Sequence, residues 1–252
     1  MPAAAHDPII TLLSDFGTRD SYVAEMKAVL LRNCRSARLI DITHEIAAHD
    51  IVAGSIALER ALHAFPPRTV HLAVVDPGVG GERVLLICTI AKQTVVCPDN
   101  GLITWPCRRL GKAQTFELTW RPASSSNTFH GRDIMAPAAG RIAAGKRLRT
   151  LARPFAEPVL LNLAPSTTDV GQVIHIDHFG NATTNIPWKA AGETMVRVKG
   201  KLLGPLRRTY SDVARGEPVA LIGSSGLIEV AIREGSAAQS LQLKVGDEVR
   251  LA

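Results

Sequence analysis

Hydrophobic and polar positions follow different patterns in the two halves of the chain. In the first half, short apolar runs alternate with longer segments whose apolar residues recur at helical spacing. The predicted strands are 8–13, 37–42 and 69–75, and the predicted helices are 22–33 and 50–65. Asp50 precedes the second helix as an N-cap would, and Pro66 ends it. This order of elements predicts an α/β domain with a central, mostly parallel sheet.

The sheet is expected to continue with antiparallel strands. Two further apolar runs, 84–90 and 93–98, are separated by a gap short enough for a hairpin. A third helix is predicted over 133–145, with Asp133 near its start. Residues 152–169 contain three prolines and few helical signals, so we interpret them as the connection between two domains.

After this connection the pattern changes to short apolar runs, separated by turns rich in Gly, Asn and Asp. The predicted strands are 171–177, 183–186, 194–200, 218–224, 227–232 and 248–252. Several short strands with such turns are typical of a small antiparallel β-barrel. We therefore expect an N-terminal α/β domain over residues 1–160 and a C-terminal β-barrel domain over residues 161–252.

Composition narrows the classes of function. The 252 residues carry a formal charge of +6, but the basic residues are scattered and aromatic residues make up only 4%, so nucleic acid is not an expected partner. No segment of about 20 apolar residues is present, so no membrane span is expected. The N-terminal stretch lacks the pattern of a signal peptide, and the four cysteines form no C-x-x-C pair. A cytoplasmic protein with reduced cysteines is the resulting expectation.

Polar segments follow the first three predicted strands. SDFG, DITHE and VDPGVG stand at carboxyl ends, which meet at one edge of a parallel sheet and are the usual place for a ligand. Asp15 and Asp20, in and after the first segment, are residue types common in turns and caps. A carboxylate at this position could also accept hydrogen bonds from both hydroxyls of a ribose.

The stretch VVDPGVGGERV places Asp76 and Arg83 on either side of a glycine turn. It is not a dinucleotide fingerprint, because it gives G-x-G-G and leads into an apolar β run. A turn between strands explains the glycines but not the charged pair that flanks them. His130 stands in the polar stretch FHGRD before a predicted helix, and is a candidate acid or base.

Two pairs of histidines could bind a metal only if their side chains shared a face. His44 and His49 are five residues apart, one more than the zinc-protease pattern H-E-x-x-H requires on a helix. In a strand, His175 and His178 would point to opposite faces. We therefore expect no metal site.

The predicted barrel carries further candidates. Asp177, Phe179 and Asn181 fall in a turn between strands, where Gly-Asn is common for conformational reasons, although an exposed Phe179 could stack on a flat ring. Glu229 interrupts an apolar strand, and a charged residue in that position needs a partner or a ligand.

Seven motifs in this order resemble those of the S-adenosyl-L-methionine (SAM) hydroxide adenosyltransferases: SDFGTRDSYVAEMK, DITHEI, VDPGVGGER, PDNG, FHGRDIMAP, IDHFGN and SSGLIEVAI. That family consists of SAM hydrolases and is similar to the fluorinases and chlorinases. The likeness covers the chain from about residue 9 to 240. It implies an N-terminal α/β domain and a C-terminal barrel, a homotrimer with SAM held between subunits, and hydrolysis of SAM to adenosine and L-methionine without cofactor or metal.

The resemblance also implies roles for individual residues. The implied catalytic set is Asp76, Arg83 and His130. The implied substrate contacts are Asp15 for the ribose, Asp20 and Ser21 near the methionine group, Phe179 and Asn181 on the adenine side, Asp177 near the methionine ammonium, and Ser224 and Ser225 near its carboxylate, with Glu229 nearby. Two positions depart from the halogenases, which have an Arg where this chain has Ser225 and an aromatic residue where it has His49.

Two other functions stay open. A SAM-dependent halogenase would use the same scaffold, but halogenases carry Tyr-Pro-x-Thr-Gly where this chain has DPGVG, and the carboxylate of Asp76 would repel a halide. A non-enzymatic sensor that binds SAM or adenosine is the second alternative.

Overall fold

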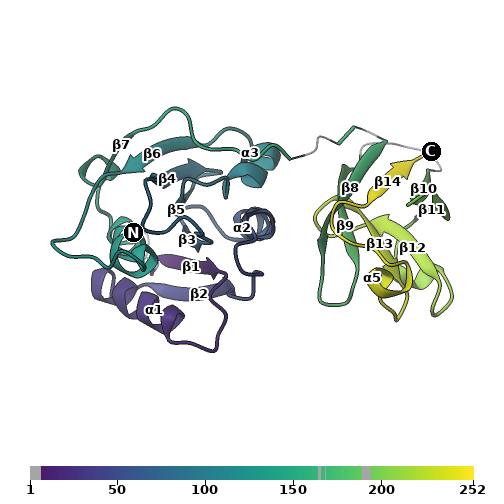
Figure 1. Cartoon of the computed structure of the whole chain (residues 1–252), viewed down its shortest axis with the longest axis horizontal. Coiled ribbons are helices and arrows are strands. Elements are labelled where there is room, and N and C mark those ends of the chain that lie inside the picture. Colours follow the sequence, from purple (N-terminus) through teal and green to yellow (C-terminus); the bar gives the residue numbers. More distant parts are fainter. Residues whose placement is uncertain (1–6, 164–165, 168, 189–193) are drawn as a thin grey trace, which may run out of the picture. The chain divides into compact units, whose positions relative to one another are not determined.

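The computed structural model describes residues 7–163, 166–167, 169–188 and 194–252. The chain divides into two compact units, Met1–Leu161 and Asn162–Ala252 (Figure 1). Each unit has its own hydrophobic core. In the described ranges, no helix has both the length and the apolar character that crossing a membrane requires.

The first unit is built on a seven-stranded sheet with the order β2-β1-β3-β5-β4-β6-β7. Its strands are β1 (Ile9–Ser14), β2 (Arg38–Thr43), β3 (Val70–Val74), β4 (Leu85–Ile90), β5 (Gln93–Pro98), β6 (Gln114–Leu118) and β7 (Ala152–Pro154). Strands β2, β1, β3 and β5 are parallel, and β4, β6 and β7 extend the sheet through antiparallel pairs. The predicted α/β sheet with an antiparallel extension is therefore confirmed.

Helices cover both faces of this sheet. They are α1 (Tyr22–Asn33), α2 (Ile51–Ala64), α3 (Thr104–Leu110) and α4 (Ala136–Ala143), the last preceded by a π-helical turn at Gly131–Met135. Because successive strand residues point to opposite faces, Leu12 packs in the cluster with α1 and α4, while Leu13 packs in the cluster with α2 and α3. Burial on both faces explains why β1 and β3 are apolar runs without alternation.

The predicted boundaries of α2 have clear physical causes. The backbone N–H of Ala53 donates to the Asp50 side chain (2.9 Å), so Asp50 is the N-cap. The helix ends at Ala64, and Phe65 is extended, as a residue before a proline usually is.

Three elements of the first unit lie outside the predicted pattern. Ala152–Pro154, which we interpreted as part of the connection, pairs with β6 as the edge strand β7, a place in a sheet where proline is tolerated. Helix α3 contains Pro106 in its first turn, where proline costs no helical hydrogen bond, and β6 is a short strand of only five residues.

The second unit is a closed barrel with the strand order β10-β11-β12-β13-β9-β8-β14. Its strands are β8 (Val170–Ile176), β9 (Ala182–Pro187), β10 (Met195–Val198), β11 (Lys201–Arg207), β12 (Pro218–Ile222), β13 (Leu227–Ile232) and β14 (Glu248–Leu251), and α5 (Ala237–Ser240) is a single turn. The predicted barrel is confirmed. Strand β11 was not predicted because Gly204 and Pro205 interrupt it, and its pairing with β12 is parallel.

A buried polar chain crosses the parallel strands of the first unit. Thr11 Oγ1 and His71 Nδ1 are 2.7 Å apart, His71 Nε2 and Gln93 Oε1 are 2.8 Å apart, and Gln93 Nε2 donates to the carbonyl of Leu62 (2.7 Å). Because Gln93 uses its amide as the donor to Leu62, its oxygen accepts from His71 Nε2, and Nδ1 then accepts from Thr11. Burial lowers the pKa of His71, so the ring is neutral in the folded protein.

The stability of the first unit should therefore depend on the protonation of His71. The pKa of His71 in the folded state lies below the unfolded value of about 6.5, so the unfolded chain takes up the proton first. We expect the free energy of unfolding to fall as the pH decreases from about 7 to 5. The measurement is urea unfolding followed by far-ultraviolet circular dichroism. His71→Gln should be less stable and should show a weaker pH dependence, whereas equal slopes in the two proteins would contradict this origin.

Candidate active site

The segments after β1, β2 and β3 meet at one edge of the first sheet. The backbone N–H of Gly17 donates to the carbonyl of His44 (2.7 Å), and that of His49 donates to Asp15 Oδ2 (2.9 Å). On the other side of β1, Asn100 of the PDNG motif follows β5 and donates through Nδ2 to the carbonyl of Val75 (2.8 Å). These contacts join the segment after β1 to that after β2, and the segment after β3 to that after β5. Because β1 and β3 are neighbours in the sheet, the three polar segments SDFG, DITHE and VDPGVG lie along one edge, as the sequence predicts.

Asp76, Arg83 and His130 are in contact at this edge. Arg83 Nε donates to both carboxylate oxygens of Asp76 (2.9 and 3.2 Å), and Arg83 Nη2 makes a further bond to Asp76 Oδ2. Arg83 Nη1 donates to His130 Nδ1 (3.0 Å). The Asp76 and Arg83 side chains are only 4% and 12% exposed. The structure thus brings together three residues that are up to 54 positions apart in the chain (130 − 76).

The glycine turn between Asp76 and Arg83 has a specific steric role. Gly80 has a φ of +82°, a conformation that favours glycine, and a Cβ at this position would lie 2.6 Å from the carbonyl oxygen of Asn127. The turn can therefore approach the segment that leads to His130 only because residue 80 has no side chain. The turn is closed by hydrogen bonds from Val79 N–H to the carbonyl of Asp76 (3.2 Å) and from Gly81 N–H to that of Gly78 (3.1 Å).

The contact with Arg83 fixes the protonation state of His130. A guanidinium has only N–H donors, so His130 Nδ1 must accept, and the single ring proton is on Nε2. Burial and the charge of Arg83 lower the pKa of His130, against smaller opposing effects of Asp76 and Asp133. At neutral pH the site therefore presents a fixed cation and a neutral imidazole that can donate through Nε2. This arrangement suits stabilisation of a developing negative charge on an oxygen.

The remaining candidates of the first unit differ in environment. The carboxylate of Asp15 is largely buried at the polar edge, while Asp20 is exposed in the same loop. The hydroxyl of Ser21 donates to Glu25 Oε1 (2.7 Å), so it can only accept a hydrogen bond from a ligand.

The histidines of HEIAAH do not act together. His44 is buried and bonded through Nδ1 to the Ser14 hydroxyl (2.7 Å), whereas the His49 side chain is 73% exposed. Within the described ranges, no group of three or more His, Cys, Asp or Glu side chains could hold a metal ion.

The candidates of the second unit other than Glu229 lie in two turns of the barrel. Asp177 Oδ1 accepts from the backbone N–H groups of Phe179 (2.9 Å) and Asn181 (2.8 Å), and Asn181 Nδ2 donates to Asp177 Oδ2 (3.2 Å). These bonds shape the turn and leave the Phe179 side chain 72% exposed at its tip. Ser224 and Ser225 lie in the turn between β12 and β13, Ser224 exposed and Ser225 half-buried.

Glu229 has the partner that its place in an apolar strand requires. It is 9% exposed, and the hydroxyl of Tyr210 donates to its Oε1 (2.6 Å). Burial and the bond to Glu229 raise the pKa of Tyr210 to about 12, so the phenol stays a donor. The apolar run around Glu229 predicts a partner but not its identity, because Tyr210 stands in a different segment of the chain.

Comparisons with known proteins cover both units. The family model described as "SAM hydroxide adenosyltransferase N-terminal domain" matches residues 10–152, and the corresponding C-terminal domain matches residues 171–250. A Thermus thermophilus protein named "(R)-S-adenosyl-L-methionine hydrolase" is 39% identical over 96% of this chain and 98% of its own length, and one from Salinispora tropica is 35% identical over 98% of both. A fluorinase of Actinoplanes sp. is more distant, at 28% identity over 98% of this chain and 97% of its own. The crystal structure of an uncharacterised conserved protein from Thermotoga maritima is similar with a TM-score of 0.89 and 35% identity, over 96% of this chain and 100% of that one.

The electrostatics of the three side chains predict how His130 titrates. Its pKa should lie below the ordinary value of about 6.5, and Arg83→Met should raise it, because the variant removes a positive neighbour and leaves the Asp76 charge unpaired. The measurement is the pH dependence of the assigned His130 ring resonances by NMR. Arg153→Met, which removes a cation paired with Glu117 elsewhere in the unit, is the control and should change nothing. A wild-type pKa at or above the ordinary value would contradict the arrangement.

Proposed function

The chain belongs to the SAM hydroxide adenosyltransferase family, and on that premise we propose that it hydrolyses S-adenosyl-L-methionine to adenosine and L-methionine. The observation that carries the proposal is the family match over both units. The contact between Asp76, Arg83 and His130 supports it, because a cation beside a neutral hydrogen-bond donor suits a water-derived nucleophile.

The reaction requires one bond to form and one to break at the same carbon. The oxygen of water bonds to C5′ of the ribose, the C5′–S bond breaks, and its electron pair stays on sulfur as the neutral thioether of methionine. The proton lost by the water goes to solvent. A sulfonium leaves without help from an acid, so the difficulty lies in the nucleophile, because hydroxide is scarce at neutral pH.

Arg83 and His130 supply a positive charge and hydrogen-bond donors, which stabilise a hydroxide. We propose that a hydroxide is held by an N–H of Arg83 and by Nε2–H of His130, with Asp76 fixing the guanidinium. His130 acts in this scheme as a donor through Nε2, since its Nδ1 lone pair accepts from Arg83. Holding the oxygen about 3 Å from C5′ and in line with sulfur supplies much of the remaining rate enhancement. The chemistry needs neither a metal nor a cofactor.

The substrate contacts and the assembly are also proposals. We assign the ribose hydroxyls to Asp15 and the methionine end to Asp20 and Ser21. The adenine-side contacts are Phe179 and Asn181, and the other methionine contacts are Asp177, Ser224, Ser225 and Glu229. Contribution of these barrel residues by a neighbouring subunit of a homotrimer is consistent with the exposure of Phe179 on its own unit. We further propose that the enzyme is cytoplasmic.

Halogenation is the second candidate reaction, because the relatives of this chain include fluorinases, although these are more distant than the SAM hydrolases. The carboxylate of Asp76 argues against it, since a bound halide would be repelled at this position. Incubation with SAM in fluoride or chloride should therefore yield adenosine and no halogenated nucleoside.

Removal of the cation or the imidazole should abolish most of the turnover. Arg83→Met and His130→Phe should each lower kcat by about 100-fold or more, because each loses a donor to the nucleophile. The dissociation constant for SAM, measured by calorimetry, should change far less. Adenosine and methionine are separated by chromatography, and Arg153→Met is the matched control. Tight SAM binding by a wild-type protein that releases no adenosine would instead support the sensor.

Attack at C5′ can be tested by the fate of the water oxygen. In water enriched in the heavy oxygen isotope, mass spectrometry should find the label in the 5′-hydroxyl of adenosine and none in methionine. Label in neither product would contradict hydrolysis by water at this carbon.

A further inference from the structure

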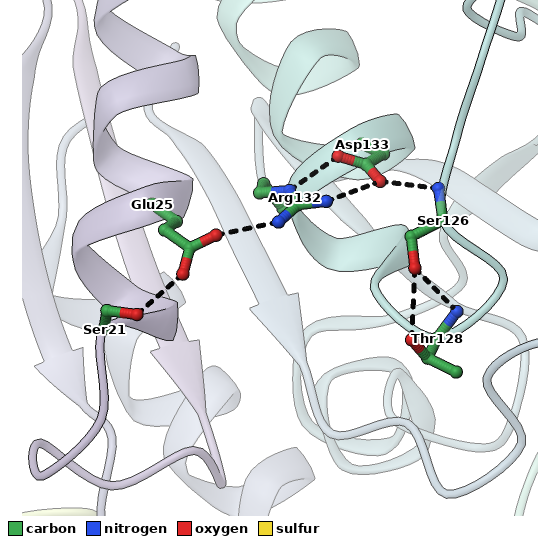
Figure 2. A network of polar contacts seen from close by, with 6 residues as sticks. All are labelled: Ser21, Glu25, Ser126, Thr128, Arg132 and Asp133. Carbon is green, nitrogen blue, oxygen red and sulfur yellow. Dashed lines mark hydrogen bonds and ion pairs between the residues drawn. The ribbon is translucent and has the colours of Figure 1, made fainter.

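A chain of charged contacts joins the first turn of α1 to the π-helical turn before α4 (Figure 2). Arg132 Nη1 donates to Glu25 Oε2 (2.8 Å). On the opposite side, Arg132 Nε and Nη2 donate to the two oxygens of Asp133 (2.7 and 3.0 Å), so the guanidinium is held by two carboxylates. Such paired bonds fix the plane of a guanidinium as well as its position.

This chain of contacts ends in two segments that carry candidate site residues. Glu25 Oε1 accepts from the hydroxyl of Ser21, which stands at the end of the loop containing Asp15 and Asp20. Asp133 Oδ2 accepts from the backbone N–H of Ser126 (2.8 Å), in the segment that leads to His130. Figure 2 shows these groups in one continuous line. The contacts from Ser21 and Arg132 lower the pKa of Glu25, so it is ionised at neutral pH.

Three aromatic rings pack together in the same region. Phe16, Tyr22 and Phe129 meet edge to face, with ring centroids 5.3 to 5.8 Å apart, and Arg132 Cζ lies 4.8 Å from the centroid of Phe129. Each ring belongs to a residue adjacent to a candidate site residue: Phe16 follows Asp15, Tyr22 follows Ser21, and Phe129 precedes His130. The aromatic and the ionic contacts therefore connect the same two segments.

The turn that carries His130 rests closely on its neighbours. A Cβ at Gly131 would lie 3.3 Å from Val74 Cγ1 and 3.4 Å from Met26 Sδ, so the glycine lets the turn pack against β3 and α1. Strand β3 leads to Asp76, and α1 begins directly after Ser21. A shift of α1 would thus move the loop 15–21 relative to His130.

From these contacts we propose that Glu25 and Arg132 are positioning residues, which fix the position of the loop 15–21 relative to His130. The proposal rests on the proposed function. Glu25 acts through Ser21: with its proton donated to Glu25, the Ser21 hydroxyl accepts from a ligand, which suits the substrate ammonium and not its carboxylate. Arg132 acts through the turn that carries His130. Because partly exposed ion pairs add little to stability, their effect should appear in catalysis rather than in unfolding.

The test compares Glu25→Ala and Glu25→Gln with Lys27→Met. Lys27 lies on the same helix and forms an ion pair of similar exposure with Asp41 (2.6 Å), so Lys27→Met removes a surface ion pair without touching Glu25 or Arg132. Glu25→Ala should lower kcat/KM by about 10- to 100-fold, with KM raised and kcat lowered, because the loop 15–21 and the turn that carries His130 are no longer held in their relative position. Glu25→Gln should recover only part of the activity, because its one amide oxygen can still accept from Arg132 while its amide nitrogen can only donate to Ser21. Arg132→Lys should behave as Glu25→Ala does, because an ammonium cannot bridge both carboxylates in the same way.

The thermal midpoint and the His130 ring resonances separate positioning from a structural role. Glu25→Ala should shift those resonances, while its thermal midpoint should differ no more from wild type than that of Lys27→Met. The proposal is overturned if Glu25→Ala keeps the wild-type kcat/KM, or if Lys27→Met loses as much. A wild-type protein that does not release adenosine from SAM refutes the proposed function instead. In that case the positioning role of Glu25 and Arg132 would be tested by the SAM dissociation constant and the His130 resonances of Glu25→Ala. Unchanged values of both would refute it.

Discussion

Arg83 is a nearly buried cation, and its N–H groups determine what its two neighbours can do. A guanidinium in such a place requires an anion beside it, and Asp76 provides one through several hydrogen bonds. The remaining contact, to Nδ1 of His130, is possible only for an imidazole with a lone pair on that nitrogen. The guanidinium of Arg83 therefore also sets the tautomer of the histidine, and its positive charge, together with burial, keeps the ring neutral. One electrostatic requirement orders all three side chains of the candidate catalytic set.

The fold meets this requirement at the carboxyl edge of a parallel sheet. Strand β3 is buried on both faces, so the backbone that leads to Asp76 at the edge of the sheet has little conformational freedom. The turn that follows must approach the segment before His130, and the absence of a side chain at Gly80 makes that approach to Asn127 possible. Packing thus fixes the backbone, and the charged contacts then fix the side chains. Preorganisation of this kind is what electrostatic stabilisation of a reacting oxygen requires.

Carboxylates act as anchors in both units of the chain. Asp76 holds Arg83, and Asp133 holds Arg132 beside the turn that carries His130. In the barrel, Asp177 closes the turn that exposes Phe179, and Glu229 holds the hydroxyl of Tyr210. In each case a hydrogen-bonded acid fixes the position of a neighbouring group within its own unit.

The two-part architecture could be predicted from the residues alone, because hydrophobic periodicity indicates which faces are buried. The helix 22–33 and the cap at Asp50 follow from local pattern. The sequence also named the residues of the candidate site, through motifs whose order resembles a known family. Local pattern could not reveal the edge strand at 152–154, because the three prolines of residues 152–169 are typical of a linker. Nor could it show that Arg83 donates to His130, or that Glu229 needs Tyr210, because these contacts join segments far apart in the chain. Such pairs are decided only when tertiary packing brings the segments together and burial makes each charge depend on a partner.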